Sequence, residues 1–113
     1  MKVVVAGSRT IDNYHAVEQA IEDSGFDVTE VISGTAKGVD SLGIIWAENN
    51  EIPVLFFPAN WNKYGKRAGY LRNVEMADNA DAVIVLWDGR SKGSKHMIDI
   101  AKRKNLPLFT KVL

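Results

Sequence analysis

The apolar runs of this chain are continuous rather than alternating. The longest unbroken one, at 82–87, is apolar throughout, and other strand-like runs, in which a few polar residues or a proline occur, occupy 2–6, 28–32, 52–57 and 106–112. A strand with one face in water alternates apolar and polar residues, whereas a strand covered on both faces does not. These runs therefore predict strands of a sheet that is covered on both sides.

Helix-like segments separate the runs. One is capped by Asp12 or Asn13, one occupies 39–50, one occupies 66–79, and the last is capped by Ser94. Strands that alternate with helices predict a parallel sheet between two helical layers. We expect an α/β fold, a single Rossmann-like three-layer α/β/α sandwich with a five-stranded parallel sheet, in which the whole 113-residue chain forms one nucleotide-binding domain.

Composition narrows the ligand class. The chain has no cysteine and only His15 and His96, so we expect no metal site and no cofactor. We expect His15 at the surface and a structural or solvent-exposed role for His96. The formal net charge of zero argues against a dedicated nucleic-acid binder without excluding one, because many Lys and Arg residues fall in four loops. No apolar run approaches the roughly 20 residues of a membrane helix, so a cytoplasmic protein without a membrane partner is expected.

The polar and glycine-rich segments follow the predicted strands. They lie at 7–10, 33–40, 61–72 and 88–96, after the first four strands in turn. In open α/β sheets ligands bind beyond the carboxyl ends of the strands, near the point where the strand order reverses. The four loops are therefore expected to form one site at that edge.

Two of these loops have a Gly-x-x-x-Gly pattern at the start of a helix. The first, 33–40, contains Gly34 and Gly38, and its helix is expected to bury Val39, Leu42, Ile45 and Trp46 on one face. The second, 89–94, contains Gly89 and Gly93. Backbone N–H groups at a helix start lack intrahelical partners and favour an anion, most often a phosphate. The alternatives, a plain turn for 33–40 and a flexible surface loop for 89–94, stay open.

Charged and aromatic side chains complete the predicted site. Arg9 and Arg72 can pair with phosphate or carboxylate, or be solvated surface charges. Trp61 and Tyr64 can stack on a base, cover the site, or form a dimer contact. A homodimer through this aromatic region is a further expectation, because so small a sheet has little surface with which to enclose a ligand. The residues expected to bind the ligand are Gly7, Ser8, Arg9, Ser33, Gly34, Thr35, Lys37, Gly38, Asp40, Trp61, Tyr64, Arg72, Asn73, Asp88, Gly89, Ser91, Gly93 and Ser94.

The loops together resemble a known family. The motifs, in chain order, are Gly7-Ser8-Arg9, Ser33-Gly34-x-Ala36-x-Gly38-Val39-Asp40, Trp46-Ala47, Pro58-Ala59-x-Trp61-x-x-Tyr64-Gly65, Ala68-Gly69-x-x-Arg72-Asn73-x-x-Met76 and Trp87-Asp88-Gly89-x-Ser91-x-Gly93-Ser94-x-His96. They resemble the YspA-type branch of the SLOG superfamily, the Rossmann-like group that includes DprA and the LOG enzymes. The resemblance implies a bacterial or phage protein that binds a nucleotide or a nucleotide-derived small molecule, in some cases as a sensor.

The resemblance also implies two alternatives. LOG enzymes hydrolyse the N-glycosidic bond of a nucleoside monophosphate with an arginine, matched by Arg72, and a glutamate, whose position holds Met97. Because a thioether cannot act as a base, Asp88 or Asp40 would have to supply the carboxylate, and Arg72 with Asp88 is the tentative catalytic pair. DprA has a segment like 33–40 and binds single-stranded DNA, for which Lys37, Lys63, Lys66 and Arg67 would supply charge.

Overall fold

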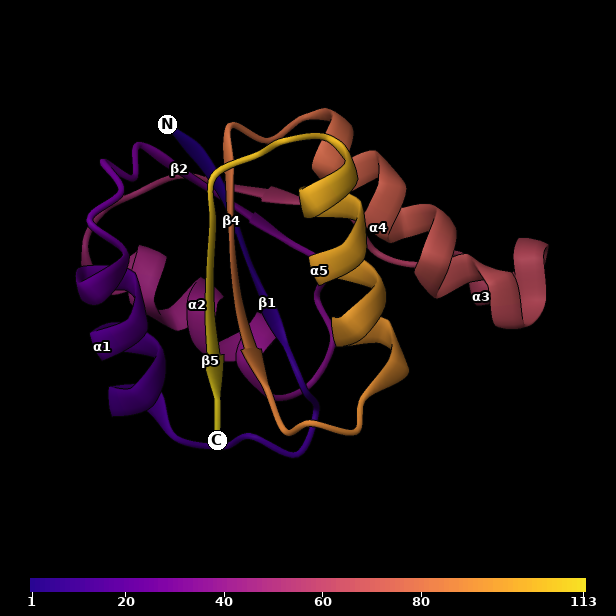
Figure 1. The fold of residues 1–113 in the computed structure, drawn as a ribbon, viewed down its shortest axis with the longest axis horizontal. Coiled ribbons are helices and arrows are strands. Elements are labelled where there is room, and N and C mark those ends of the chain that lie inside the picture. The colour runs from indigo at the N-terminus through magenta and orange to yellow at the C-terminus, as the bar shows by residue number, and fades with distance from the viewer.

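The computed structural model describes residues 1–113 and contains one parallel five-stranded sheet, as the sequence predicts. The strands lie in the order β3-β2-β1-β4-β5 (Figure 1). β1 is therefore the central strand, and the order in which the chain adds strands reverses between β1 and β4. Their bounds are β1 Lys2–Gly7, β2 Glu30–Ser33, β3 Val54–Phe56, β4 Ala82–Trp87 and β5 Leu108–Val112.

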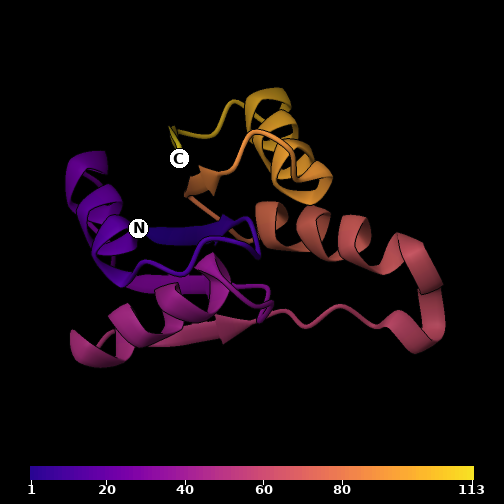
Figure 2. The ribbon, with the colours of Figure 1, turned by 90° about the horizontal axis from the view of Figure 1, so that it is seen from below.

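Two pairs of helices cover the sheet. Helices α1 (Tyr14–Ser24) and α2 (Val39–Asn49) lie on one face, and α4 (Ala68–Asp78) and α5 (Lys92–Arg103) lie on the other (Figure 2). The predicted three-layer α/β/α architecture is therefore confirmed.

Successive residues of the central strands supply two separate cores. Val3 and Val5 pack in the core beneath α1 and α2, whereas Val4 packs in the core beneath α4 and α5, and all three are fully buried. The same division holds along β4, where Ile84 and Val85 face opposite layers. Continuous apolar sequence in these strands is thus explained by two cores rather than one.

Several predicted boundaries are wrong. The second strand begins at Glu30 rather than at residue 28, and the third is limited to Val54–Phe56. The reason is local: Thr29 donates its backbone N–H to the carbonyl of Met1 (3.0 Å), and Ile52 donates to Ala47 at the end of α2 (2.8 Å), so both close connections instead of extending ladders.

Two helix details also differ from expectation. The cap of α5 is Ser91, whose Oγ accepts the N–H of Ser94 at 3.3 Å, rather than Ser94 itself. In α2 the buried face contains Val39, Leu42 and Ala47, whereas Ile45 is 44% exposed and Trp46 only partly buried against the core.

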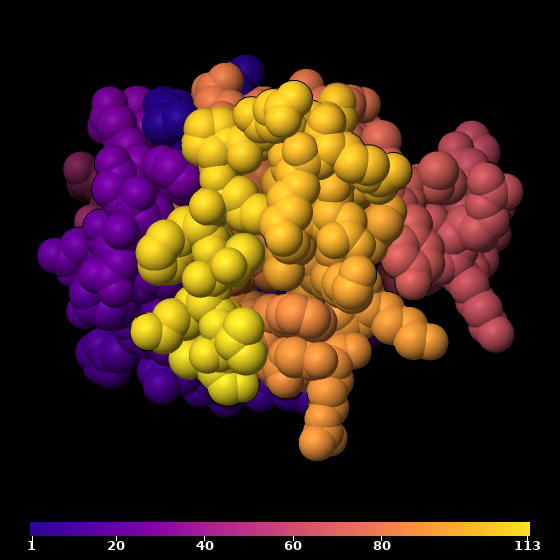
Figure 3. All heavy atoms as spheres, in the orientation of Figure 1, coloured from indigo at the N-terminus to yellow at the C-terminus, as the bar shows by residue number.

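The segment between β3 and α4 extends away from the body. The predicted loop contains the short helix α3 (Trp61–Tyr64), followed by a 3₁₀ turn (Gly65–Arg67), and neither has a buried residue. This projection stands at one side of the molecule in the ribbon and in the space-filling view (Figure 3). We call residues 60–67 the arm.

None of the helices combines the length and the apolar character needed to cross a lipid bilayer.

Candidate functional site

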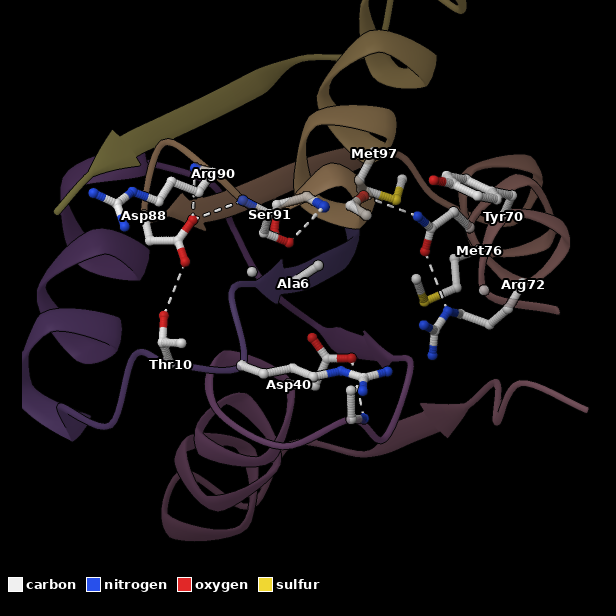
Figure 4. Close-up of a pocket in the computed structure, with 17 residues that line it drawn as sticks. Ala6, Thr10, Asp40, Tyr70, Arg72, Met76, Asp88, Arg90, Ser91 and Met97 are labelled. Carbon is white, nitrogen blue, oxygen red and sulfur yellow. Dashed lines mark hydrogen bonds between the residues drawn. The ribbon is translucent and has the colours of Figure 1, made fainter. Parts of the chain in front are cut away.

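A cavity lies where the strand order reverses. Chain connectivity runs from β1 outward to β2 and β3 on one side, and returns to β4 and β5 on the other. The loops that leave β1 and β4 diverge above this point, which is the usual place for ligands in such sheets. Here they border a cavity of about 470 Å³ together with the N-terminal parts of α4 and α5 (Figure 4).

One wall is organised by Asp88. Its carboxylate accepts the backbone N–H groups of Arg90 and Ser91, each at 2.8 Å, and the hydroxyl of Thr10 at 2.9 Å. These hydrogen bonds, the backbone ones first, lower the pKa of Asp88 to about 2. The carboxylate therefore stays ionised and holds the loop after β4 against the loop after β1.

Serine hydroxyls join this wall to the start of α5. Ser8 is fully buried, and its Oγ accepts the N–H of Asp88 at 3.0 Å and lies 3.5 Å from the Oγ of Ser94. Ser94 in turn donates to the Oγ of Ser91 at 3.1 Å. Ser91 and Ser94 line the cavity, whereas Ser8 supports them from behind.

The opposite wall is organised by Asn73, a buried residue of α4. Its Oδ1 accepts the Nε–H of Arg72 (3.2 Å), and its Nδ2 donates to the carbonyl of Gly93 (3.1 Å) and contacts Nδ1 of His96 (3.3 Å). Arg72 also donates through Nη1 to the carbonyl of Gly34 at 2.5 Å. A continuous set of hydrogen bonds thus connects the loop after β2, helix α4 and the start of α5.

Asp40 lies in the first turn of α2. It is 4% exposed, and its Oδ2 accepts the N–H of Ala36 at 3.2 Å. Burial raises the pKa of Asp40 to about 6, although the positive charges of Arg72 and Arg9 oppose the shift. The position at the α2 N-terminus that an anion would favour is therefore taken by the protein's own carboxylate.

The glycines of the 33–40 loop are required by packing. A Cβ on Gly34 would lie 2.4 Å from Nη1 of Arg72, and one on Gly38 would lie 2.4 Å from the carbonyl oxygen of Ser8. Gly38 also has a φ of +76°, which favours glycine. In the other loop, a Cβ on Gly89 or Gly93 would meet nothing within 4 Å.

A second, smaller cavity of about 110 Å³ adjoins the first. Arg9 and Arg72 line both cavities, and Gly34, Thr35 and Trp61 line the smaller one. The Arg9 guanidinium lies over the Trp61 ring, 5.9 Å from its centroid, which is a cation–π arrangement.

Sequence reasoning missed an apolar and aromatic part of the main cavity. Ala6, Met76 and Met97 line it as apolar groups, and Tyr70 lines it with its ring edge-on to His96, the centroids 4.6 Å apart. Tyr70 lies in the Ala68–Met76 motif between Gly69 and Arg72, and this position beside predicted site residues could have indicated that it lines the cavity. Thr10 and Arg90 were also missed, although both lie beside predicted site residues.

The expected ligand-binding residues divide into three groups. The main cavity is lined by Gly7, Arg9, Asp40, Arg72, Asn73, Asp88, Ser91, Gly93 and Ser94, and the smaller cavity adds Gly34, Thr35 and Trp61. Neither cavity is lined by Ser8, Ser33, Lys37, Gly38, Tyr64 or Gly89. The 33–40 loop thus contributes fewer residues to the cavities than expected. Gly38 packs against the backbone of Ser8, and the Ser33 hydroxyl forms hydrogen bonds with Thr35 and Asp40 of its own loop.

The histidines differ in environment. His15 is exposed, with Nδ1 at 3.6 Å from Glu18. The pKa of His96 is lowered mainly by burial and then by the positive charge of Arg103. No group of three or more His, Cys, Asp or Glu side chains is placed to hold a metal ion.

These features define a Rossmann-like α/β protein with a polar cavity at the switch point of its sheet. Residues 1–64 match the model of the YspA, cpYpsA-related SLOG family. The chain is also 31% identical over 118 residues to the Gene 61 protein of Mycobacterium phage D29, a match that covers 96% of this chain and 94% of that protein. The chain therefore belongs to the YspA and cpYpsA-related SLOG family, as the sequence motifs indicated.

A solved structure shows the same fold. DNA processing protein A (DprA) from Streptococcus pneumoniae superimposes with a TM-score of 0.75 at 23% sequence identity. The match covers 96% of this chain and 49% of that chain, so the chain spans about half the length of DprA.

Proposed function

We propose that the chain binds a nucleotide-type small molecule in the main cavity. The observation that carries this proposal is the convergence of Arg9, Arg72 and Arg90, from three separate segments, on a cavity that the α5 N-terminus also borders. Arginines and a helix N-terminus are the groups that bind phosphate in proteins. Membership in the SLOG family and the DprA-like fold support a ligand related to nucleotides or nucleic acid.

The phosphate is best accommodated at α5 rather than at α2. The first turn of α5 contains no acidic residue, and Gly93 leaves open space beside the cavity. The first turn of α2 contains Asp40, whose charge would repel a phosphate there. Asp88, the acidic residue before α5, lies outside the helix, and its carboxylate is already bound by the hydroxyl of Thr10 and by the N–H groups of Arg90 and Ser91. Of the two expected phosphate loops, 89–94 is therefore the stronger candidate.

The base is best accommodated against the apolar part of the cavity. Met76 and Met97 offer thioethers, which make favourable contacts with aromatic rings, and Tyr70 offers an aromatic ring. In Figure 4 Tyr70 and Met76 lie on one side of the cavity, and Asp88, Arg90 and Thr10 lie on the other. A ligand with an apolar ring at one end and a phosphate nearer α5 matches this division.

Calorimetric titration with a panel of ligands tests the proposal. The panel contains nucleoside mono- and diphosphates, NAD, ADP-ribose and short single-stranded DNA, each with the wild-type chain and with Arg90→Ala and Gly93→Val. We expect a nucleotide to bind and each variant to weaken it by about tenfold. Lys63→Ala, an exposed charge on the arm, is the matched control and should bind as the wild type does.

The outcomes separate the candidate ligands. Absence of heat with every small molecule would overturn the proposal. Binding of DNA alone, with an affinity that falls steeply as salt is added, would favour the DprA-like alternative, in which Lys63, Lys66 and Arg67 contact the strand.

Hydrolysis of a nucleoside monophosphate is a second candidate because Asp40 lies buried in the cavity near Arg72. With a pKa of about 6, Asp40 can exchange a proton near neutral pH, whereas Asp88, with a pKa of about 2 and three hydrogen-bond donors, cannot serve as an effective base. Release of free base, followed by chromatography, should then be lost in Asp40→Asn. If the wild-type chain binds a nucleoside monophosphate and releases no free base, the hydrolysis candidate is wrong and only the binding function remains.

A further inference from the structure

Exposed apolar side chains concentrate on one side of the molecule. Nine large hydrophobic residues are exposed, and five of them, Trp61, Tyr64, Tyr70, Leu71 and Val74, belong to the arm and to α4. Scattered exposed hydrophobic residues are normal, but a contiguous group marks an interaction surface.

The outward face of α4 has a regular pattern. Leu71 is 38% and Val74 41% exposed, on the side of the helix opposite the buried Met76. Arg67, the last residue of the 3₁₀ turn before α4, precedes Leu71 by four residues, and Asp78 follows Val74 by four, so the four residues form one stripe along the helix and the end of the turn that leads into it. We call Arg67, Leu71, Val74 and Asp78 the α4 stripe.

The α4 stripe is complementary to itself when reversed. Read from either end it has a charge, two apolar residues and a charge of the opposite sign. A twofold axis between Leu71 and Val74 would place each residue opposite its complement, as an isologous interface requires. A stripe suited to a different protein would have no need of this internal antisymmetry.

We propose that α4 is the interface for a second copy of this chain, packed antiparallel across a twofold axis. Leu71 of one copy packs against Val74 of the other, and Arg67 pairs with Asp78 of the other. Asp78 already pairs with Lys104 through Oδ1, which leaves Oδ2 for the arginine. The proposal is independent of what the cavity binds.

The same arrangement would bring the second copy to the mouth of the cavity. Tyr70 is 43% exposed beside the stripe, and it also lines the cavity. In the paired state Tyr70 lies opposite Glu75 of the other copy, by the same symmetry about the axis. The arms, with Trp61 and Tyr64, then extend the contact beyond the two helices.

Sedimentation of the full chain tests the interface. We expect a concentration-dependent dimer that Leu71→Glu weakens by roughly a hundredfold, since it places a carboxylate at the centre of the contact. Ile45→Glu, at an apolar residue of similar exposure on α2, is the matched control and should leave the dimer unchanged. Circular dichroism of each variant checks that the fold is retained.

Charge exchange tests the register. Arg67→Asp and Asp78→Arg should each weaken the homodimer by about tenfold, because each creates two repulsive pairs per dimer. An equimolar mixture of the two variants should form a heterodimer of nearly wild-type affinity, because both pairs become attractive again. A wild-type chain that stays monomeric up to about 1 mM would overturn the interface. Failure of the mixture to restore association would overturn the register.

Discussion

The two glycine-rich loops, 33–40 and 88–94, have the same pattern in sequence and opposite uses in the structure. In the first, Gly34 and Gly38 are glycines because Arg72 and the Ser8 backbone approach where a Cβ would be. In the second, Gly89 and Gly93 face open space. The first loop packs the protein against itself, and the second leaves room for something else.

The acidic residues of the two loops, Asp40 and Asp88, have pKa values that are shifted in opposite directions. Burial raises the pKa of Asp40 to about 6, whereas hydrogen bonds lower the pKa of Asp88 to about 2. Burial disfavours the ionised form of Asp40, which can therefore change its charge near neutral pH, whereas Asp88 remains ionised. Substitutions in the two loops should therefore produce contrasting results.

The largest difference is expected at the positive-φ glycines. Gly38→Ala should lower the free energy of unfolding by about 4 kcal/mol, because it combines backbone strain with overpacking. Gly89→Ala also places an alanine at a positive φ, +81° against +76°, but in open space, and should cost only about 1 kcal/mol. Urea denaturation measures both, and equal losses would contradict the packing role of the first loop.

The two aspartates should give stability profiles of opposite slope. Asp40 ordinarily titrates at 3.8 and in the folded chain at about 6, so its stabilising effect is complete below 3.8 and is lost as pH rises through 6. Wild type should lose about 3 kcal/mol relative to Asp40→Asn between pH 4 and pH 7. Asp88 is the opposite case: its contribution is present above 3.8 and is lost as pH falls towards 2, relative to Asp88→Asn. Urea denaturation across this pH range checks both, and parallel profiles would contradict the contrast.

Asn73 should couple the two loops. Asn73→Ala removes the hydrogen bonds to Gly93 and from Arg72, and should lower the free energy of unfolding by about 2 kcal/mol. Asn62→Ala, at an exposed arm residue, should stay within about 0.5 kcal/mol of wild type. A loss of similar size in both variants would mean that Asn73 has no special connecting role.

The smallest effect on stability is expected at Gly93. Gly93→Ala should raise the free energy of unfolding by about 0.5 kcal/mol, because alanine favours the helix and meets no neighbour. The same substitution should weaken binding of any ligand found in the panel. Thermal unfolding and calorimetry together decide this, and a destabilised chain would show that the space beside Gly93 is needed for folding.

The fold was predictable because it depends on pattern. Alternate residues of β1 and β4 pack into two different cores, so no polar residue occurs between Val3 and Ala6 or along β4, and the sequence shows continuous apolar runs there. Strand ends were less predictable. Thr29 and Ile52 are compatible with a strand, and only their hydrogen bonds to Met1 and Ala47 exclude them from the ladders.

The site was predictable in location but not in detail. Arg72, Asn73 and Asp88 follow predicted strands, and the sheet edge brings them together. Neither the packing of Gly38 against Ser8 nor the position of Tyr70 beside His96 is encoded in local spacing, because each depends on a contact between distant segments. A glycine in a sequence can indicate that no side chain fits at that position, but it does not indicate which neighbouring segment occupies the space.

The hydrogen bonds around Asp88 affect the entropic cost of binding any ligand in the cavity. Thr10, Arg90 and Ser91 are fixed to one carboxylate by the protein's own hydrogen bonds. Immobilising loops and side chains during association costs conformational entropy, and here that entropy has been lost during folding instead. The opposite wall is ordered in the same way, by the hydrogen bonds that Arg72 and Asn73 make with each other and with Gly34 and Gly93, whereas the arm next to it has no buried residue in α3 or the 3₁₀ turn. A ligand therefore meets two walls that were ordered during folding, and the entropic cost of any further ordering falls on the arm.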